Sequence, residues 1–400
     1  MTVPSTHGRS LRVLLMSPLR DVDPFSGDVV YTEALLEKPP DGVTYVPYVD
    51  ALRSGELLEH GRRSSAQDAA GLVGHCRAVV TVAREHAVNA LRQRDVLFRE
   101  PFRFMEVRGS FDLVHCHTYS VRWTGRPTPV VVSNALPLRE LYARARGWDE
   151  RKVDRADRAD RLLARALGVD HIEYGLGAVQ RVVAFTRVLA DWYVHNGVAP
   201  ERVGVAPCFP PGMDRATERR PVPGRVGFVA GAFVAKGGDT VLAAMPAVRR
   251  ARPDAHLVIA GGETDLDPRT LAEAAATKVG YLSRADLLSD FFPQCAVFAY
   301  PSRMDGLPLT LLEAMATGLP CAVSDYFALP EVVGTGGRSV PQDNPVALAA
   351  ALVDLLDPVT NDAAGSAALA RYRDTYAPDA VRPLLRQNYE LAQQSGGSRA

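Results

Sequence analysis

Two carboxylates, those of Asp305 and Glu313, have seven residues between them in a segment that joins a strand end, a loop and a helix (residues 300–320). Pro308 is predicted to lie in the first turn of this helix, and Gly318 marks its end. The spacing puts Asp305 in the loop before the helix and Glu313 on its second turn. Both side chains can therefore face one ligand.

The loop and helix predict a nucleotide-sugar site. The backbone amides of Gly306 and Leu307, together with the positive end of the helix, suit a diphosphate. A carboxylate at Glu313 suits a ribose diol because it can accept two hydroxyl protons. The alternative is that Asp305 is a turn residue and Glu313 a solvated helix position.

Other residues could supply a cation or imidazoles. Lys236 ends a glycine-containing turn at residues 228–237 and is one of only four lysines, where the alternative is a surface lysine. His115 and His117 are two residues apart on an expected strand, so both face one side of it. Such a pair could bind a metal, but no third ligand is nearby in sequence, so we expect no metal.

These residues need a scaffold of buried strands and helices. Short, nearly continuous apolar runs alternate with helical patterns, which predicts parallel sheets covered on both faces and an α/β fold. The expected strands are residues 12–16, 111–116, 129–133, 181–186, 203–206, 225–230, 256–261, 295–300 and 320–324. The expected helices include residues 27–36, 240–252, 309–317 and 380–394.

The proline-rich stretch of residues 207–224 interrupts this pattern and is the expected hinge. We therefore expect two doubly wound, Rossmann-like domains, residues 1–212 and 213–378, and a C-terminal helix, residues 379–400, that packs on either domain. Two such domains facing across a cleft would bring the carboxyl ends of both sheets to one crevice, where anionic ligands bind.

The composition excludes several classes of protein. The chain has 400 residues, and its 46 basic side chains balance 46 acidic ones, which disfavours a nucleic-acid partner. Neither a long apolar run nor a signal sequence is recognisable, so we expect a cytoplasmic protein. The five cysteines are scattered and form no CxxC pair, which argues against disulfides and structural zinc.

The segment at residues 300–320 resembles the signature of glycosyltransferase family 4, whose members are retaining enzymes of the GT-B fold. In that family a Glu-x7-Glu pair lies in a segment that reads like EGLPLxLLEAMAxGxP. The resemblance assigns the first acid, here Asp305, to the donor sugar, and the second, Glu313, to the ribose. This sequence has Asp where the family usually has Glu, which shortens the first side chain by one methylene.

The resemblance also orders the remaining candidates. Residues 228–237 look like the strand-end GRLxxxKG of the family, so Lys236 is expected to bind the donor diphosphate. Ala232 stands where the family has an arginine, and Arg303 is a candidate substitute for that cation. Residues 111–117 look like the DxxHxH strand end, which directs His117 toward the sugar and acceptor with support from His115.

Three further positions are carried over from the family. Gly27 corresponds to the first Gly-rich loop, where backbone amides approach the donor phosphate, although it could equally be a turn residue before a helix. Glu331 corresponds to the acid of an LPE motif near the nucleotide. Thr186 occupies a serine position at a strand end, and could also be a helix cap.

The resemblance implies retaining, metal-independent transfer of a sugar from a nucleoside-diphosphate donor, with a UDP-sugar favoured. We expect the acceptor to be a hydroxyl of a small molecule or glycoside of secondary metabolism, and the scarcity of lysine beside abundant alanine indicates a bacterial source. His117, Asp305 and Lys236 are the expected catalytic residues. Two alternatives remain: a nucleotide-sugar 2-epimerase of the same fold, and a non-catalytic nucleotide-sugar or glycan-binding relative. Arginines and phenylalanines alternate in residues 88–108, which suggests a membrane-surface patch or a solvated basic helix face.

Overall fold

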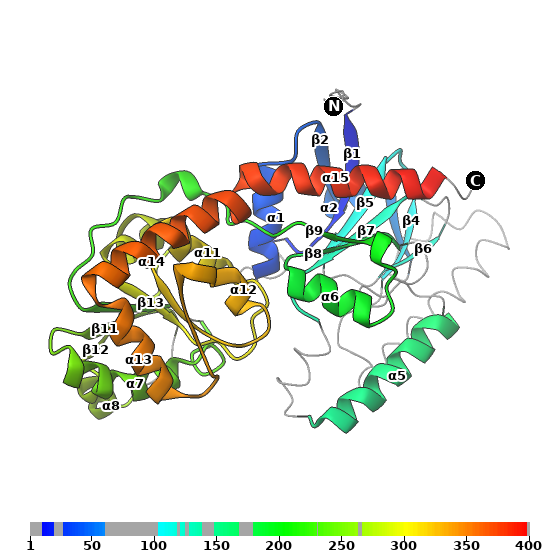
Figure 1. The fold of residues 1–400 in the computed structure, drawn as a ribbon. Helices are drawn as coiled ribbons and strands as arrows, with labels where there is room; N and C mark the ends of the chain where they lie inside the picture. The colour runs from blue at the N-terminus through cyan, green and yellow to red at the C-terminus, as the bar shows by residue number, and fades with distance from the viewer. Residues whose placement is uncertain are drawn as a thin grey trace, which may run out of the picture. The chain divides into compact units, whose positions relative to one another are not determined.

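The structure is a computed structural model that describes residues 10–19, 27–60, 103–117, 121–124, 128–137, 148–167, 179–229, 231–262 and 266–397. Its contacts divide the chain into two units (Figure 1). Unit 1 comprises Met1–Phe185, Leu189–Ala206 and Arg382–Ala400, and unit 2 comprises Thr186–Val188 and Pro207–Val381. The chain thus enters the longer part of unit 2 at Pro207, where the proline-rich stretch begins.

Unit 1 is built on a six-stranded sheet in which all paired strands are parallel. Its strands are nearly continuous apolar runs, as burial on both faces requires. In spatial order they are β2 (Val43–Pro47), β1 (Leu11–Met16), β5 (Leu113–His117), β7 (Val130–Asn134), β8 (Val179–Ala184) and β9 (Val203–Val205). The helices of this part of the chain include α1 (Gly27–Glu37), α2 (Tyr48–Arg53), α5 (Glu150–Leu167) and α6 (Arg187–His195).

Unit 1 also contains a small mixed sheet that the sequence did not predict. It consists of β3 (Leu57–His60), β4 (Arg103–Val107) and β6 (Val121–Thr124), with β3 antiparallel and β6 parallel to β4. These strands mix charged and apolar residues, so no apolar run marks them. Residues 103–107 form a strand, so a helical interpretation is wrong for this end of the basic segment, and residues 88–102 lie outside the described part of the chain.

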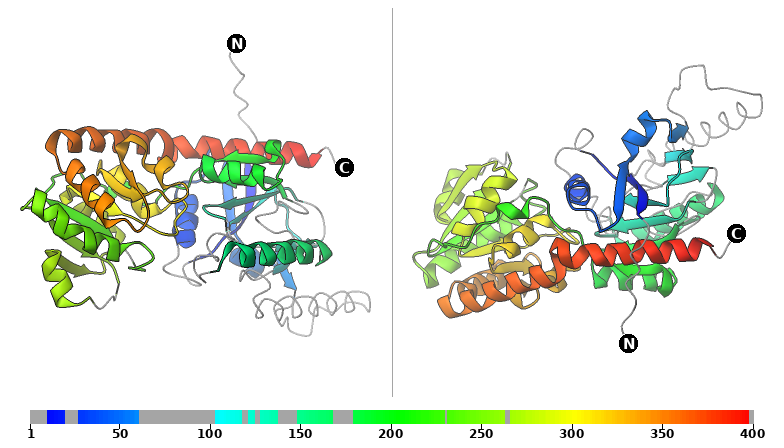
Figure 2. Two further views of the ribbon diagram at one scale, coloured as in Figure 1. Left: turned by 60° about the horizontal axis from the view of Figure 1, so that its bottom comes forward. Right: turned by 90° about the horizontal axis from the view of Figure 1, so that it is seen from above.

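The end of helix α15 (Pro378–Gly397) from Arg382 onward belongs to unit 1 and runs along it in each view (Figures 1 and 2). Arg382 donates through Nε to the carbonyl of Pro39 at 2.8 Å, and Arg386 donates to the carbonyl of Gly42 at 3.0 Å. Leu385 and Tyr389 are buried, one helical turn apart. The amphipathic pattern expected for residues 380–394 thus packs on this unit.

Unit 2 contains a second six-stranded sheet, again parallel at every pair. In spatial order its strands are β12 (Ala276–Gly280), β11 (His256–Ala260), β10 (Arg225–Val229), β13 (Val297–Tyr300), β14 (Cys321–Ser324) and β15 (Gly337–Val340). The helices are α7 (Gly238–Ala251), α8 (Pro268–Glu273), α9 (Arg284–Asp286), α10 (Phe292–Gln294), α11 (Leu309–Ala316), α12 (Leu329–Val333), α13 (Pro345–Leu355) and α14 (Pro358–Arg371). Two doubly wound parallel sheets confirm the expected α/β architecture.

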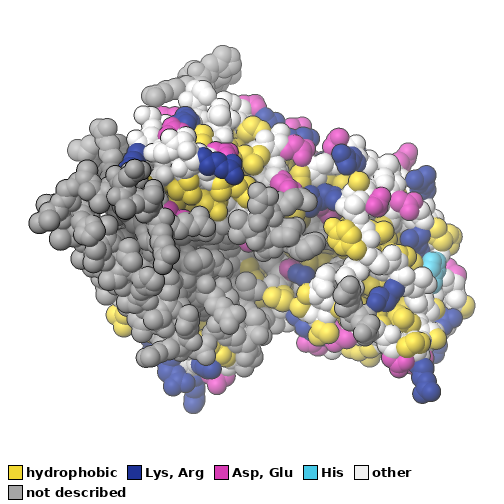
Figure 3. Space-filling model, turned by 180° about the vertical axis from the view of Figure 1, so that it is seen from behind, with side chains coloured by type: hydrophobic (Ala, Val, Ile, Leu, Met, Phe, Trp, Pro, Cys, Tyr) yellow, Lys and Arg dark blue, Asp and Glu magenta, His cyan; other side chains and the backbone are white. Residues whose placement is uncertain are grey.

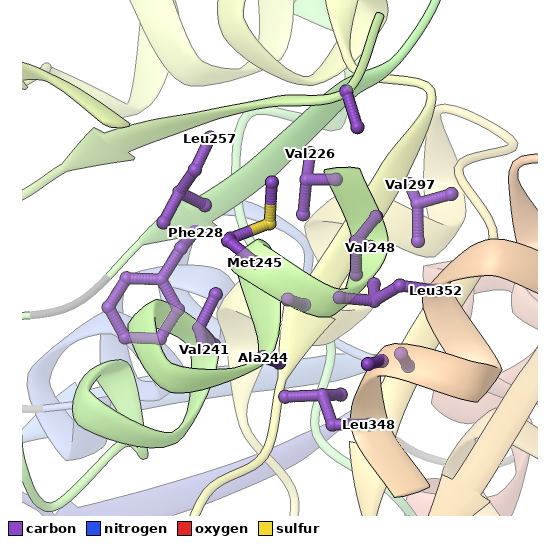
Figure 4. Close-up of a cluster of buried hydrophobic side chains, with 14 of the residues drawn as sticks. Val226, Phe228, Val241, Ala244, Met245, Val248, Leu257, Val297, Leu348 and Leu352 are labelled. Carbon is purple, nitrogen blue, oxygen red and sulfur yellow. The ribbon is translucent and has the colours of Figure 1, made fainter. Parts of the chain in front are cut away.

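A hydrophobic core fixes β10 and α7 in unit 2. In this cluster the side chains of α7 lie between those of β10 and those of α13 (Figure 4). Phe228 of β10, Met245 of α7 and Leu352 of α13 are all fully buried. The loop between β10 and α7 is therefore held at both of its ends by close packing.

Charged side chains of both signs are interspersed over the described part of the surface shown in Figure 3, in keeping with the balanced composition. None of the helices that the structure describes combines the length and the apolar character needed to cross a bilayer. The four described cysteines are buried and unbonded to one another, and Cys76 lies outside the described residues.

Truncating the core of unit 2 should loosen this unit. We expect Leu352→Ala, at a fully buried position, to lower the free energy of unfolding of unit 2 by about 2–5 kcal/mol because it leaves a cavity. Val346→Ala on the same helix, at a position that is 78% exposed, should change it by less than about 0.5 kcal/mol.

Hydrogen–deuterium exchange of peptides from β10 and α7 is the measurement, because all three tryptophans, Trp123, Trp148 and Trp192, belong to unit 1. Tryptophan fluorescence then reports the other unit as an internal control. Equal exchange in the Leu352 and Val346 variants would contradict the assignment of this core.

Candidate functional site

The strand order of unit 2 reverses between β10 and β13. After β10 the chain continues to β11 on one side, and after β13 it continues to β14 on the other. Loops that leave neighbouring parallel strands in opposite directions form a crevice at the carboxyl ends of those strands, and ligands of doubly wound sheets bind there. Lys236 lies in the first of these loops and Asp305 in the second.

Asp305 joins the two loops. Its Oδ1 accepts a hydrogen bond from Nζ of Lys236 at 2.5 Å, and its Oδ2 accepts from Oη of Tyr300 at 2.7 Å and from Oγ of Ser302 at 2.5 Å. Burial acts to raise the pKa of Asp305, but the positive charge of Lys236 and the hydrogen bonds outweigh it, so this pKa lies below its ordinary value. Asp305 is therefore a partly buried, ionised residue with three partners.

The hydroxyl of Tyr300 is a donor in this cluster. Burial raises the pKa of Tyr300 well above its ordinary value, and the negative charge of Asp305 raises it further. The phenol therefore keeps its proton at neutral pH and directs it at the carboxylate.

The backbones of the two loops also touch. The amide of Arg303 donates to the carbonyl of Ala235 at 3.0 Å. Gly237 has a φ of +79°, and a Cβ atom there would lie 2.3 Å from the carbonyl oxygen of Pro301. Only glycine suits this position, because both the left-handed backbone and the close approach exclude a side chain.

Arg303 is fully engaged by its own unit. It donates through Nε to Asp343, through both Nη atoms to Asp239, and also to the hydroxyl of Thr240 and the carbonyl of Val234. A guanidinium has five N–H donors, and these contacts use all five. The suggestion that Arg303 replaces the missing family arginine stays a prediction, and a phosphate would first have to break this network.

Lys236 differs from Arg303 in its spare hydrogen-bonding capacity. An ammonium group has three donors, and among the described residues only Asp305 accepts a hydrogen bond from Nζ of Lys236. Its side chain is 24% exposed. Lys236 can therefore keep its contact with Asp305 and still donate to an anion.

The loop before α11 supplies backbone donors. Within the described part of the chain, the amides of Gly306 and Leu307 have no hydrogen-bond acceptor. Both residues are buried, and Pro308, in an extended conformation, immediately precedes the helix. Unpaired amides at a helix N-terminus are a preferred site for an anion.

Glu313 lies on α11 and is only 3% exposed, so the alternative of a solvated helix position is excluded. Its Oε1 accepts a hydrogen bond from Nε of Arg284 at 2.7 Å. Burial raises the pKa of Glu313 above its ordinary value, and the nearby Arg284 offsets only part of that increase. No motif in the sequence marked Arg284, which lies on the three-residue helix α9.

Glu331 has a clear structural partner. Its two carboxylate oxygens accept hydrogen bonds from the backbone amides of Arg187 and Val188, each at 2.9 Å. These amides belong to the first turn of α6, whose donors otherwise lack partners within the helix. Glu331 therefore accepts from the backbone just after Thr186, within the residues 186–188 that belong to the same unit, and its assignment to the nucleotide remains a prediction.

In unit 1, His117 lies at the carboxyl end of β5, beside β1, where the strand order of this sheet also reverses. Its Nδ1 contacts Oγ of Ser133 at 2.9 Å and its Nε2 contacts Oδ1 of Asp28 at 3.1 Å. His117 is 1% exposed, and Phe185 stacks on its ring at 5.5 Å. Sequence reasoning missed Asp28 and Ser133 because neither belongs to the quoted motifs of β5.

His115 is a buried neighbour of His117. Burial, assisted by His117, lowers the pKa of His115 to about 3, so the ring is neutral at physiological pH. Gly27 is the first residue of α1, and a Cβ atom there would meet nothing within 4 Å. The chain itself therefore does not require glycine at position 27. Among the described residues, no cluster of three or more His, Cys, Asp or Glu side chains could hold a metal.

The unit 2 region matches a known family. Residues 223–358 match the family described as "Glycosyl transferases group 1". The chain is 33% identical over 147 residues to a GDP-mannose-dependent monoacylated alpha-(1-6)-phosphatidylinositol monomannoside mannosyltransferase of Corynebacterium glutamicum, covering 34% of this chain and 39% of that protein. It is 29% identical to the lipopolysaccharide core biosynthesis mannosyltransferase LpsB of Rhizobium meliloti, covering 39% of this chain and 48% of the relative.

The chain thus spans less than half the length of these two relatives. A longer match joins it to a phosphatidyl-myo-inositol mannosyltransferase of Mycobacterium leprae, at 27% identity over 66% of this chain and 71% of that protein.

Solved structures share the fold of the whole chain. Sucrose-phosphate synthase from Thermosynechococcus elongatus aligns with a TM-score of 0.58 and 17% identity, covering 97% of this chain and all of the other. The Anabaena protein HepE, solved with UDP and glucose, aligns with a TM-score of 0.58 and 11% identity over 95% of this chain and 99% of the other. The chain thus shares the GT-B fold with these structures, and its residues 223–358 match the glycosyl transferases group 1 family.

Proposed function

We propose that this protein is a retaining glycosyltransferase that moves a sugar from a nucleoside-diphosphate donor to an acceptor hydroxyl without a metal ion. One observation carries the proposal. At the switch point of the unit 2 sheet, the ammonium of Lys236 and the unpaired amides before α11 lie in neighbouring loops, and Glu313 follows on that helix. A cation with amides suits a diphosphate, and a buried carboxylate suits a ribose diol.

The chemistry requires stabilisation of a departing diphosphate while positive charge develops on the sugar. Fixed donors aimed at the leaving group can each contribute about 3 kcal/mol to transition-state stabilisation. Lys236 and the amides of Gly306 and Leu307 would supply this stabilisation. The acceptor would attack on the face of the leaving group, and a diphosphate oxygen would take its proton, which gives retention.

His117 and Asp305 have different proposed roles. We assign His117 to the donor sugar and acceptor, as the family resemblance implies, with Nε2 as the nitrogen that faces away from Ser133. Asp305 holds Lys236 in place through a short ion pair and contacts the sugar only if this pairing leaves an oxygen free. The shorter acid therefore acts here mainly on the cation beside the leaving group.

The donor and acceptor are proposed at the level of chemical class. A UDP-sugar is our first choice, since a protein of the same fold was solved with UDP and glucose. GDP-mannose is the competing donor, because the name of a relative at 33% identity specifies it. The acceptor is a hydroxyl of a small molecule or glycoside, and a mannosylated lipid is the variant that the names of the relatives suggest.

Incubation with UDP-glucose, UDP-N-acetylglucosamine and GDP-mannose tests the function. We expect slow release of free sugar with retained anomeric configuration, followed by proton NMR, and the same rate in excess EDTA. Epimerised donor would indicate the 2-epimerase, and binding without turnover would indicate the non-catalytic relative. Loss of turnover in EDTA that manganese restores would contradict metal independence.

Glu313→Gln should weaken binding of the matching nucleoside diphosphate about 10- to 100-fold, because one charged hydrogen-bond acceptor of the diol is lost. Because burial raises the pKa of Glu313, the affinity of the parent should fall with decreasing pH earlier than an ordinary glutamate would allow. Calorimetric titration is the measurement, with the exposed Glu273→Gln as matched control. Unchanged affinity in a normally melting Glu313 variant would exclude the ribose assignment.

Lys236→Ala should lower kcat/KM by roughly 10²- to 10³-fold, the loss expected for one transition-state donor. Lys236→Arg should recover only part of this, because a planar guanidinium replaces a compact ammonium. Lys278→Ala, at an exposed position of β12, is the control and should leave turnover intact. Ala232→Arg, which restores the arginine that the family has at this position, should tighten diphosphate binding because it adds a cation to the loop after β10. Turnover of Lys236→Ala within a few fold of the parent would place the diphosphate elsewhere.

A further inference from the structure

A continuous chain of hydrogen bonds connects the C-terminal helix of unit 1 to His117. Oη of Tyr45 contacts Oη of Tyr389 at 2.7 Å, and Tyr389 contacts Nδ1 of His115 at 2.7 Å. Nε2 of His115 contacts Oγ of Ser133 at 2.8 Å. The same hydroxyl contacts Nδ1 of His117 at 2.9 Å, and Nε2 of His117 contacts Asp28 at 3.1 Å.

The members of this chain are withdrawn from solvent. Tyr389, His115 and Ser133 are fully buried, His117 is 1% exposed, and Tyr45 is 9% exposed. Buried polar groups need hydrogen-bond partners within the protein, and an unmet buried donor costs about 1–3 kcal/mol. The arrangement of protons along the chain is therefore restricted to those that leave no donor unmet.

One direction satisfies every donor. Tyr45 donates to Tyr389, Tyr389 donates to Nδ1 of His115, and Nε2–H of His115 donates to Ser133. The hydroxyl of Ser133 then donates to Nδ1 of His117, whose Nε2–H donates to the carboxylate of Asp28. Each of these hydrogen atoms has one acceptor, and the neutral ring that this direction gives His115 agrees with its low pKa.

The opposite direction is less favourable. It would direct the proton of Tyr389 at Tyr45, whose own hydroxyl has no other acceptor among the described residues. In that direction Nδ1–H of His117 would donate to the carbonyl of Ser133 at 3.1 Å, but a neutral ring would then present a bare Nε2 to the Asp28 carboxylate at 3.1 Å.

We propose that Tyr389 is a positioning residue that, through His115 and Ser133, holds the proton of His117 on Nε2. The last part of α15 thereby determines which nitrogen of His117 acts as a hydrogen-bond donor. Ring contacts fix the plane of that imidazole, since Tyr31 lies 4.7 Å and Phe185 5.5 Å from it between ring centroids. The effect on catalysis rests on the proposed function, whereas the position of the proton does not.

Long-range proton–nitrogen NMR spectra of the ¹⁵N-labelled full chain test this directly, because they report which ring nitrogen of each histidine carries a proton. The nine histidines would be assigned through single substitutions. We expect the Nε2–H form for both His115 and His117 at neutral pH. The Nδ1–H form or a charged ring at His117 would overturn the proposal, whatever the activity.

A variant that reverses the chain is a second test. O-methyltyrosine at position 389, in a Tyr45→Phe background that makes room for the methyl group, accepts a hydrogen bond but cannot donate one. Nδ1 of His115 must then carry the proton, and His117 should shift to Nδ1–H. Tyr45→Phe alone is the control, because it leaves the donor at Tyr389 in place, and should keep both Nε2–H forms. An unshifted His117 in the O-methyl variant would contradict the role of Tyr389.

Kinetics separate this proposal from the proposed function. If His117 donates through Nε2, the O-methyl variant should lose about tenfold or more in kcat with little change in KM for the donor, and Tyr45→Phe should not. A shifted proton with unchanged kcat would leave the relay standing and contradict the catalytic assignment of His117. Unshifted spectra in the O-methyl variant would exclude the relay even if turnover fell.

Discussion

The carboxylate of Asp305, with its side chain 17% exposed, makes the interactions on which the unit 2 site depends. Removing one partner of this partly buried ion pair would leave the remaining charge without compensation. The loops after β10 and β13 therefore cannot separate without exposing or neutralising Asp305. Lys236 and the amides that follow Asp305 are in this way held at adjacent strand ends before any ligand arrives, which is the preorganisation that transition-state stabilisation needs.

In unit 1 a set of buried polar side chains is satisfied by hydrogen bonds to one another and not by an ion pair such as Lys236–Asp305. Its hydrogen-bond chain runs from Tyr45 through Tyr389 to His115, and burial keeps His115 neutral. In a hydrogen-bonded chain of this kind, the donor at one end determines which atom carries the proton at the other end. An ion pair such as Lys236–Asp305 mainly holds its two side chains close together. The two units thus present different resources: unit 2 a fixed cation with backbone donors, and unit 1 an imidazole whose proton is ordered by a distant helix.

The buried strands could be predicted from sequence because each is a nearly continuous apolar run, as in β5 and β13. The strands of the small sheet and the edge strands β2, β12 and β15 could not, since their residues face solvent in part or mix polar with apolar groups. Lys236, Asp305 and Glu313 were identifiable by motif, but the contact between Lys236 and Asp305 depends on strand order. The pairing of Lys236 with Asp305 spans 69 residues, and that of Tyr389 with His115 spans 274, so neither has a local signal.

The charges around the unit 2 loops limit how the proposed diphosphate could be held. Three cations, Lys236, Arg284 and Arg303, contact four carboxylates among the described residues, namely Asp239, Asp305, Asp343 and Glu313. The side chains alone therefore offer no excess of positive charge, and Arg303 has no N–H to spare. An anion would therefore be bound by donors that point at it and not by net positive charge. These donors are the two remaining N–H groups of Lys236, the amides of Gly306 and Leu307, and the positive end of the α11 dipole. The aspartate at position 305 is compatible with this arrangement. One of its oxygens pairs with Lys236, and the hydroxyls of Tyr300 and Ser302 donate to the other. The carboxylate is thereby held in one place, and it holds the ammonium of Lys236 where the proposed ligand would bind.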